Sequence, residues 1–269
     1  MDNLLTVNSL SLRAGTRTLV SDLSFTLAPG DRVGLIGESG SGKSLTALAI
    51  NGLLPAAIQA SGSVQLAGQS IIGASDRQLT RLRGSQVATV FQEPLTALNP
   101  LMRIGQLIAE PVQRTARRTG RAADRRAVTH AVLRWIERVA LPQPEKIVTA
   151  WPHELSGGQR QRVAIAMALA CEPALLIADE PTTALDVTTQ AEILKLLMSL
   201  VTEQGSALLF ISHDLPVVAK VANRVMVMNK GRLVEQGDIA VVFRQPEDEY
   251  TKILVAAARS FDTALGYRP

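Results

Sequence analysis

Cysteine, aromatic residues and long apolar runs are all scarce in this 269-residue chain. Its one cysteine, Cys171, excludes a disulfide framework and cannot hold an iron–sulfur cluster, which usually takes four thiolates. Aromatic residues make up 3% of the chain, so we expect an aliphatic core. No apolar run approaches the roughly 18 residues of a membrane span, and the start Met1-Asp2-Asn3 lacks the basic segment of a signal peptide. We therefore expect no membrane span, no signal peptide and a reducing compartment.

The remaining composition fits one folded domain with sub-lobes. Hydrophobic residues make up 46% of the chain, enough to bury a sizeable core at this length. The net charge is +4, and much of the excess lies on arginines between residues 114 and 138. These arginines could bind nucleic acid, but we favour a solvated helix face, because charge runs are usually solvated and no aromatic platform accompanies them. The arginines are Arg114, Arg117, Arg118, Arg121, Arg125, Arg126, Arg134 and Arg138.

A glycine-rich segment near the N-terminus has the pattern of a phosphate-binding loop. It runs Gly37-Glu38-Ser39-Gly40-Ser41-Gly42-Lys43-Ser44 and fits G-x-x-x-x-G-K-[ST] at every fixed position. The run before it predicts a buried strand, and the run after it predicts the start of a helix. At such a turn backbone N–H groups converge on phosphate, Lys43 adds positive charge near the β- and γ-phosphates, and Ser44 offers a hydroxyl to Mg²⁺. The sequence predicts a nucleoside triphosphate site; the alternative is a strand–helix turn without a ligand.

Two carboxylates follow a second buried-strand run, Ala174–Ala178. Asp179 and Glu180 would lie at the carboxyl end of a parallel strand, where open α/β sheets bind ligands. Asp179 suits Mg²⁺, usually through water, and Glu180 could polarise an attacking water as general base. The alternative is a pair that merely starts a turn before Pro181, but the phosphate-binding loop favours the catalytic interpretation.

Two further polar residues follow strand-like runs. Gln92 comes after Val87–Phe91, and its side-chain amide could reach metal or water. His213 comes after Ala207–Ser212, and its imidazole could hydrogen-bond the γ-phosphate and sense its loss. A histidine in such a loop is more often structural, so this role depends on the sites described above.

A second candidate phosphate-binding feature is the segment Leu155-Ser156-Gly157-Gly158-Gln159, which opens an apolar helix over Arg160–Cys171. Ser156 is a good N-cap, and Gly157 and Gly158 leave the first N–H groups of the helix bare. A helix N-terminus of this kind can bind an anion. The alternative is an ordinary capped helix, in which two glycines would cost stability.

Strand and helix signals alternate around these motifs, which predicts an α/β fold with a parallel sheet, helices on both faces, an antiparallel β-lobe and a helical lobe. The expected elements are strands at Leu4–Leu12, Leu19–Leu27 and Ser63–Gln69, a helix at Thr188–Val201, a hairpin over Arg224–Glu235 and a helix at Tyr250–Ala258. We expect one domain, 1–269. It divides into a β-lobe with the P-loop core (1–92), a helical subdomain with the LSGGQ segment (93–170), the rest of the core (171–245) and a C-terminal tail (246–269).

Together these motifs resemble the ATP-binding cassette (ABC) ATPases. The P-loop, the Gln92 loop, LSGGQ, LLIADE and Thr183-Ala184-Leu185-Asp186 occur in the order of that family and end at His213. The resemblance implies a P-loop NTPase (RecA-like) fold and an ATPase that uses ATP and Mg²⁺. It also implies head-to-tail dimers, in which Ser156 and Gly158 of one subunit complete the γ-phosphate site on the P-loop of the other, with Asp186 at the dimer seam.

The same resemblance implies a role for each motif residue. The catalytic residues would be Glu180, His213, Gln92 and Lys43. Mg²⁺ would bind Ser44, Gln92 and Asp179. ATP would contact Gly37, Glu38, Ser39, Gly40, Ser41, Gly42, Lys43, Ser44, Ser156, Gly157, Gly158, Gln159 and Asp186.

A narrower resemblance is to the ATPases of oligopeptide, dipeptide and nickel importers. It rests on Phe91–Pro100, on Trp151–Ser156, and on Gln245-Pro246 and Tyr250-Thr251 in the tail. It implies a peripheral protein on the cytoplasmic face of the inner (plasma) membrane that energises uptake of peptides, or of nickel and related small solutes. The implied partners are transmembrane permease subunits, a second ABC ATPase subunit, identical or different, and indirectly a solute-binding protein. No nucleic acid is expected.

Two other functions compete with this interpretation. A soluble cassette ATPase acting on nucleic acid or ribosomes would usually carry two cassettes or long insertions, whereas this chain has one P-loop and one LSGGQ. A plain P-loop kinase would leave LSGGQ and His213 without roles.

The chain departs from the family at the expected adenine contact. Cassette ATPases usually stack adenine on an aromatic residue near the first strand, and Leu12–Arg17 contains none. Arg13 or Arg17 could stack through its planar guanidinium. Base selectivity is therefore open, whereas phosphate binding does not depend on this contact.

Overall fold

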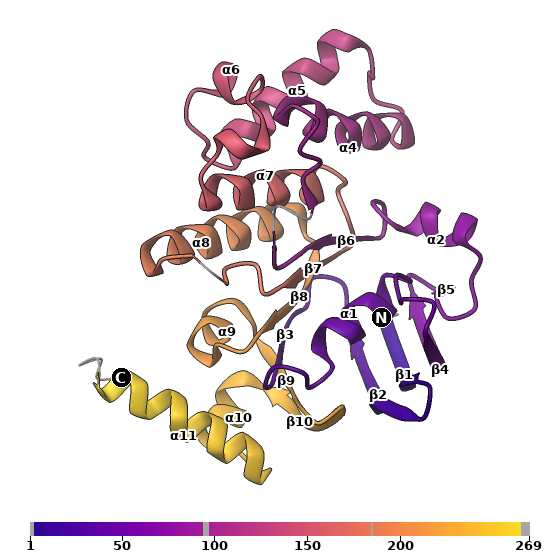
Figure 1. Ribbon diagram of the computed structural model, residues 1–269, viewed down its shortest axis with the longest axis vertical. Coiled ribbons are helices and arrows are strands. Elements are labelled where there is room, and N and C mark those ends of the chain that lie inside the picture. The colour runs from indigo at the N-terminus through magenta and orange to yellow at the C-terminus, as the bar shows by residue number, and fades with distance from the viewer. Residues whose placement is uncertain (1–2, 94–96, 184, 265–269) are drawn as a thin grey trace. The chain divides into compact units, whose positions relative to one another are not determined.

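The chain folds as two compact units. The first unit comprises Met1–Leu79 and Ala207–Pro269, and the second comprises Thr80–Ser206. The computed structural model describes residues 3–93, 97–183 and 185–264, with side chains described as far as residue 258 in the last helix (Figure 1). Helix α2 (Asp76–Leu82) contains the first point at which the chain passes between the units.

One sheet of the first unit is antiparallel and has the strand order β2-β1-β4-β5. The strands are β1 (Leu5–Ala14), β2 (Arg17–Leu27), β4 (Ile58–Leu66) and β5 (Gln69–Ser70). The apolar residues Leu23, Phe25 and Leu27 alternate with polar ones and are buried, as the two-residue period of a half-buried strand requires. This sheet is the predicted antiparallel β-lobe.

The other strands of the first unit carry the phosphate-binding loop. They lie in the order β10-β9-β3-β8, with bounds β3 (Arg32–Ile36), β8 (Ala207–Ser212), β9 (Arg224–Asn229) and β10 (Arg232–Asp238). β3 pairs in parallel with both β8 and β9, and β9 and β10 form an antiparallel hairpin. All six residues of β8 are buried, which explains its continuous apolar run. The helices of this unit are α1 (Lys43–Ile50), α9 (Leu215–Val221), α10 (Ile239–Arg244) and α11 (Glu249–Ala264).

The second unit is mostly helical. Its parallel strands β6 (Val87–Val90) and β7 (Leu175–Asp179) pair with each other. Its helices are α4 (Ile104–Arg118), α5 (Arg125–Arg138), α6 (Pro144–Ile147), α7 (Gly157–Leu169) and α8 (Val187–Gln204), with a 3₁₀ turn at Pro152–Glu154. Helices α4 and α5 contact each other and α7, which gives the predicted helical lobe (Figure 1).

The predicted α/β class and most of the expected elements are confirmed. The hairpin and the helix before Gly205 are present, and the C-terminal helix is longer than expected, since it reaches Ala264. The strand expected at Ser63–Gln69 is wrong at both ends: β4 begins at Ile58, and it stops at Leu66 because Ala67 and Gly68 turn with φ of 48° and 75°. Among the described residues, no helix combines the length and hydropathy that a bilayer crossing requires.

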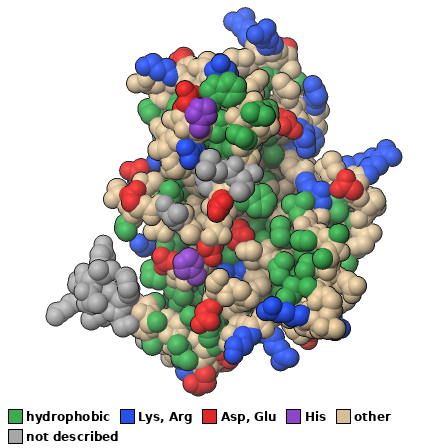
Figure 2. Space-filling model, viewed as in Figure 1, with side chains coloured by type: hydrophobic (Ala, Val, Ile, Leu, Met, Phe, Trp, Pro, Cys, Tyr) green, Lys and Arg blue, Asp and Glu red, His purple; other side chains and the backbone are tan. Residues whose placement is uncertain are grey.

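The arginine-rich stretch falls on α4, α5 and the turn between them. Seven of its eight arginines are exposed, as a solvated helix face predicts, and Arg138 is half-buried. Arg138 stacks its guanidinium over the ring of Trp135 at 4.1 Å and pairs with Glu203 at 2.9 Å. Lys and Arg side chains are scattered over this part of the second unit on the face shown in Figure 2, rather than gathered in one continuous patch.

Candidate functional site

The glycine-rich loop joins β3 to α1, as its pattern predicts. β3 ends at Ile36, and α1 begins at Lys43 after an N-cap at Gly42, whose φ of 103° is left-handed. Gly37 has a φ of 149°, and a Cβ built there would lie 2.1 Å from the carbonyl oxygen of Met228 in β9. No side chain fits at that distance, so the first glycine of the motif is a packing requirement of the strand next to it.

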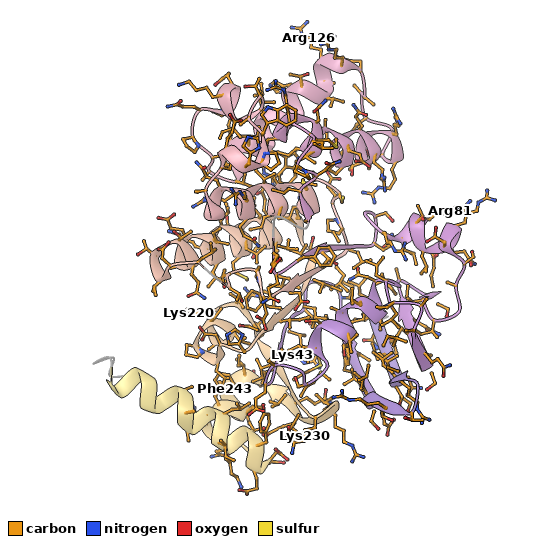
Figure 3. All side chains as sticks on the ribbon, viewed as in Figure 1. Lys43, Arg81, Arg126, Lys220, Lys230 and Phe243 are labelled. Atoms are coloured by element: carbon orange, nitrogen blue, oxygen red, sulfur yellow. The ribbon has the colours of Figure 1, made fainter. Side chains whose placement is uncertain are left out.

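The loop is held by hydrogen bonds from its own lysine and from the β9–β10 turn. The Lys43 ammonium donates to the carbonyl oxygens of Gly37 at 2.7 Å and Glu38 at 2.9 Å (Figure 3 labels Lys43). The Gly231 N–H donates to the carbonyl oxygen of Ser41 at 3.1 Å. Lys43 is 5% exposed, so its charge is concentrated inside the loop.

A buried hydroxyl in the loop supports anion binding. Ser41 is 4% exposed, and its Oγ has no hydrogen-bond partner among the described residues. A buried polar atom without a partner is costly and calls for an explanation, such as a ligand. With Lys43 and the N-terminus of α1 beside it, the loop fits a phosphate group.

His213 lies at the same sheet edge as the loop. In the parallel pairing of β3 with β8, the last pair is Ile36 with Ser212. Gly37 and His213 are the next residues of the two strands, so they leave the sheet at the same edge. The next residue, Asp214, caps α9 by accepting a hydrogen bond from the Val217 N–H. The structure therefore brings His213 and the phosphate-binding loop to one edge, as the strand pattern predicts.

A tyrosine that the sequence reasoning did not assign also reaches the loop. The Glu38 N–H donates a hydrogen bond to the Tyr250 hydroxyl at 2.9 Å, so the start of α11 contacts the loop. Burial raises the pKa of the Tyr250 phenol above its ordinary value, although the hydrogen bond from the Glu38 N–H acts in the opposite direction. Its sequence signal is the Tyr250-Thr251 pair, which by itself indicates only a subfamily tail.

In the second unit, Gln92, Asp179 and Glu180 share an edge. Val90 pairs with Ala178, so Gln92 lies just beyond β6, while Asp179 is the last residue of β7 and Glu180 follows it. Asp179 is 8% exposed, and Glu180 has a left-handed φ of 47°. The Thr183 hydroxyl donates to Glu180 Oε2 at 3.1 Å. Several other described non-glycine residues, Ala67 among them, share this left-handed conformation, so the backbone alone assigns no role to Glu180.

The LSGGQ segment begins α7 with the predicted cap. Ser156 Oγ accepts a hydrogen bond from the Gln159 N–H at 3.3 Å, and Gln159 Oε1 accepts one from the Ser156 N–H at 2.9 Å. Ser156 and Gly157 are exposed. A Cβ on Gly158 would lie 2.7 Å from the Thr189 methyl group, so the second glycine allows α7 to approach α8. The helix start is thus capped, closely packed on one side and open to solvent on the other.

Asp186 caps the start of α8. Its carboxylate accepts hydrogen bonds from the Thr189 N–H at 3.0 Å and from the Thr189 hydroxyl at 2.7 Å. These bonds, the backbone one first, hold the pKa of Asp186 below its ordinary value. Because Thr189 contacts both Asp186 and the Gly158 position, the starts of α7 and α8 lie together in the second unit.

The structure does not test some of the predicted positions. Pro94, Leu95 and Thr96 of the Gln92 loop and Ala184 of the Thr183–Asp186 segment lie outside the described residues. Arg13 and Arg17, the candidate adenine contacts, are exposed on the β1–β2 hairpin, where Arg13 pairs with Thr18 and Ala14 with Arg17. Stacking by either arginine stays a prediction.

Comparison with known proteins identifies relatives along most of the chain. A family model described as ABC transporter matches residues 20–183. The chain is 49% identical over 260 residues to the peptidoglycan transport ATP-binding protein YejF of Agrobacterium fabrum, covering 94% of this chain and 47% of that protein. It thus spans about half the length of that relative. It is 42% identical over 266 residues to the oligopeptide transport ATP-binding protein OppD of Haemophilus influenzae, covering 97% of this chain and 81% of that protein.

A solved structure has the same fold. It is the dimeric ATP-binding cassette MJ0796 in a post-hydrolysis state bound to ADP and Pi. The two chains superpose with a TM-score of 0.76 at 27% identity, over 87% of this chain and 98% of that one. The chain is therefore similar in sequence to transport ATP-binding proteins and in structure to a nucleotide-bound cassette.

Proposed function

Because the chain belongs to the ABC transporter family, we propose that it is the ATP-hydrolysing subunit of an importer that takes up peptides through separate membrane subunits. Relatives named for peptide, oligopeptide and peptidoglycan transport support this substrate class over nickel. The protein would act at the cytoplasmic face of the membrane, bound to permease subunits and to a second ATPase subunit. A solute-binding protein would deliver the peptide on the other side.

The proposal rests on the structure of the loop between β3 and α1. It combines a glycine that no other residue can replace, a buried lysine ammonium and a buried serine hydroxyl without a partner among the described residues. These three features together suit the phosphates of a nucleotide better than they suit a turn that only connects a strand to a helix.

The chemistry is in-line attack of water on the γ-phosphate, for which a protein supplies mainly positioning and charge stabilisation. Lys43 and the loop N–H groups would bind the β- and γ-phosphates. Glu180 would accept a hydrogen bond from the attacking water and orient it. His213 would hydrogen-bond the γ-phosphate and sense its loss. Each of these roles is transferred by motif position and is open to substitution tests.

The magnesium site is assigned by the positions of the residues in the sequence motifs. Mg²⁺ is usually held by one or two carboxylates together with substrate phosphates and water. Asp179, Gln92 and Ser44 would hold it here, and when bound the ion would offset charge on the phosphate oxygens.

The exposed start of α7 supports a shared site in a dimer. Ser156, Gly157, Gly158 and Gln159 present a capped helix N-terminus to solvent, and a helix N-terminus favours a negative charge. We infer that this surface, with Asp186 beside it, completes the nucleotide site of a second subunit. Whether that subunit is identical does not change the chemistry.

Purification of the chain together with its neighbouring membrane subunits tests the function. We expect a detergent-stable complex whose ATP hydrolysis, after reconstitution with a binding protein, rises when peptide is added and is lost in Lys43→Ala. Sedimentation of the chain with ribosomes or DNA, and no complex with membrane subunits, would instead support the soluble cassette ATPase. Stimulation by nickel and not by peptide would contradict the substrate class.

A further inference from the structure

The peptide group between Gly37 and Glu38 is held at both ends. Its carbonyl oxygen, on Gly37, accepts a hydrogen bond from the Lys43 ammonium at 2.7 Å. Its N–H, on Glu38, donates to the Tyr250 hydroxyl at 2.9 Å. The two partners therefore fix the orientation of one peptide plane, at the point where the chain leaves β3 and enters the phosphate-binding loop.

Tyr250 reaches the loop from a helix that is itself anchored. The Glu235 carboxylate on β10 accepts hydrogen bonds from the Glu247 N–H at 3.0 Å and the Asp248 N–H at 3.1 Å, just before α11 begins. Asp248 in turn accepts a hydrogen bond from the Tyr250 N–H at 2.8 Å. A chain of hydrogen bonds thus runs from β10 through the start of α11 to the loop.

The neighbouring hydroxyl on α11 makes no comparable contact. Thr251 is fully buried, and its Oγ1 has no hydrogen-bond partner among the described residues. Tyr250 is only half-buried, yet its hydroxyl is the one that meets a backbone donor of the loop. The contact is therefore specific to this side chain rather than a general property of the helix start.

We propose that Tyr250 is a positioning residue for nucleotide binding, which acts by holding the Gly37–Glu38 peptide in the orientation that places the Lys43 ammonium. The inference rests on the proposed binding of ATP at the loop. Tyr250 does not touch the reacting atoms in this account. Its effect passes through the peptide to Lys43, the group expected at the β- and γ-phosphates. Losing the hydroxyl frees the peptide to rotate, so that Lys43 must be reordered when ATP binds.

This role predicts a change in affinity rather than in chemistry. A neutral hydrogen bond contributes enough that its loss changes an equilibrium about three- to tenfold. We expect Tyr250→Phe to raise the KM for ATP, and the Kd measured with a fluorescent ATP analogue, by about that factor, while kcat is unchanged. A variant that is only less stable would have a smaller active fraction, which lowers the apparent kcat and leaves KM unchanged.

The matched control is Thr251→Val, which removes a hydroxyl from the next residue of the same helix. It should leave both the Kd and KM for ATP at the wild-type values, because that hydroxyl makes no hydrogen bond among the described residues. Glu235→Gln replaces one accepting oxygen by a donor and should weaken ATP binding through the same chain of contacts. The double variant Glu235→Gln/Tyr250→Phe should then lose less affinity than the sum of the two single losses.

The outcomes separate this inference from the proposed function. A wild-type chain that does not bind ATP contradicts the proposed function itself. Wild-type ATP binding with an unchanged Kd in Tyr250→Phe overturns the positioning role. Tighter ATP binding by Tyr250→Phe also overturns it, because the tyrosine would then compete with the nucleotide for the Glu38 N–H.

Discussion

Replacing Gly37 by alanine tests the loop geometry most severely. A Cβ at this residue would lie 2.1 Å from the Met228 carbonyl oxygen and 2.8 Å from Ser41 Oγ, so β9 or the loop must move. Such overpacking costs about 1–3 kcal/mol, and the strained backbone of a non-glycine residue adds about 1–3 kcal/mol. We therefore expect Gly37→Ala to lower the free energy of unfolding by about 2–6 kcal/mol and to abolish tight ATP binding.

Gly40→Ala is the matched comparison for stability. Gly40 also has a left-handed φ, of 79°, but a Cβ there meets no atom within 4 Å. Gly40→Ala should therefore lower the free energy of unfolding only through backbone strain, by about 1–2 kcal/mol. The difference between the two variants reports the clash at Gly37 together with the difference in backbone strain between φ values of 149° and 79°.

The assay must report on the first unit. Both tryptophans, Trp135 and Trp151, lie in the second unit, so tryptophan fluorescence is the wrong probe. Urea unfolding of the nucleotide-free protein is followed by far-UV circular dichroism. Hydrogen exchange of the β3 and β9 amides then gives the loss of stability around the loop. Equal losses in Gly37→Ala and Gly40→Ala, or no loss in Gly37→Ala, would refute the packing argument.

Three further predictions concern other parts of the site. Ser156→Ala removes the acceptor for the Gln159 N–H and should cost about 1 kcal/mol in urea unfolding, whereas Ser199→Ala on the exposed face of α8 should be neutral. Because the folded-state pKa of Asp186 is lowered, its stabilisation is fully present above the ordinary carboxyl pKa and is lost as pH falls through the lower folded-state pKa. Asp186→Asn should therefore flatten the acid side of a profile of stability against pH. Competition binding should show weak discrimination between ATP and GTP, because Leu12–Arg17 has no aromatic residue; a strong ATP preference would mean that another residue supplies the platform.

The parts of the site that follow from local pattern were predictable. A fixed run of glycine, lysine and serine after an apolar strand specifies the loop between β3 and α1, and Ser156 followed by Gln159 specifies a capped helix. That Gln92 and Asp179 share an edge also follows, since parallel strands of one sheet end on the same side.

The contacts between distant segments were not predictable. Glu38 and Tyr250 are 212 residues apart, and nothing in the spacing of either segment indicates that a tail helix meets the loop. The end of β4 is signalled only in part: Gly68 suits a two-residue hairpin turn, but alanine rarely takes the left-handed conformation that Ala67 adopts. The packing of Gly37 against Met228 likewise depends on the pairing of β3 with β9.

We propose that the chain hydrolyses ATP with Glu180 at a site completed by a second subunit. The most direct test of this claim is ATP turnover and molecular mass in solution, with and without ATP, for Glu180→Gln. We expect this variant to bind ATP, not to turn it over and to accumulate as an ATP-bound dimer, while Glu145→Gln on the exposed side of α6 keeps wild-type turnover. Unchanged hydrolysis by Glu180→Gln, or an ATP-bound variant that stays monomeric, would contradict the claim.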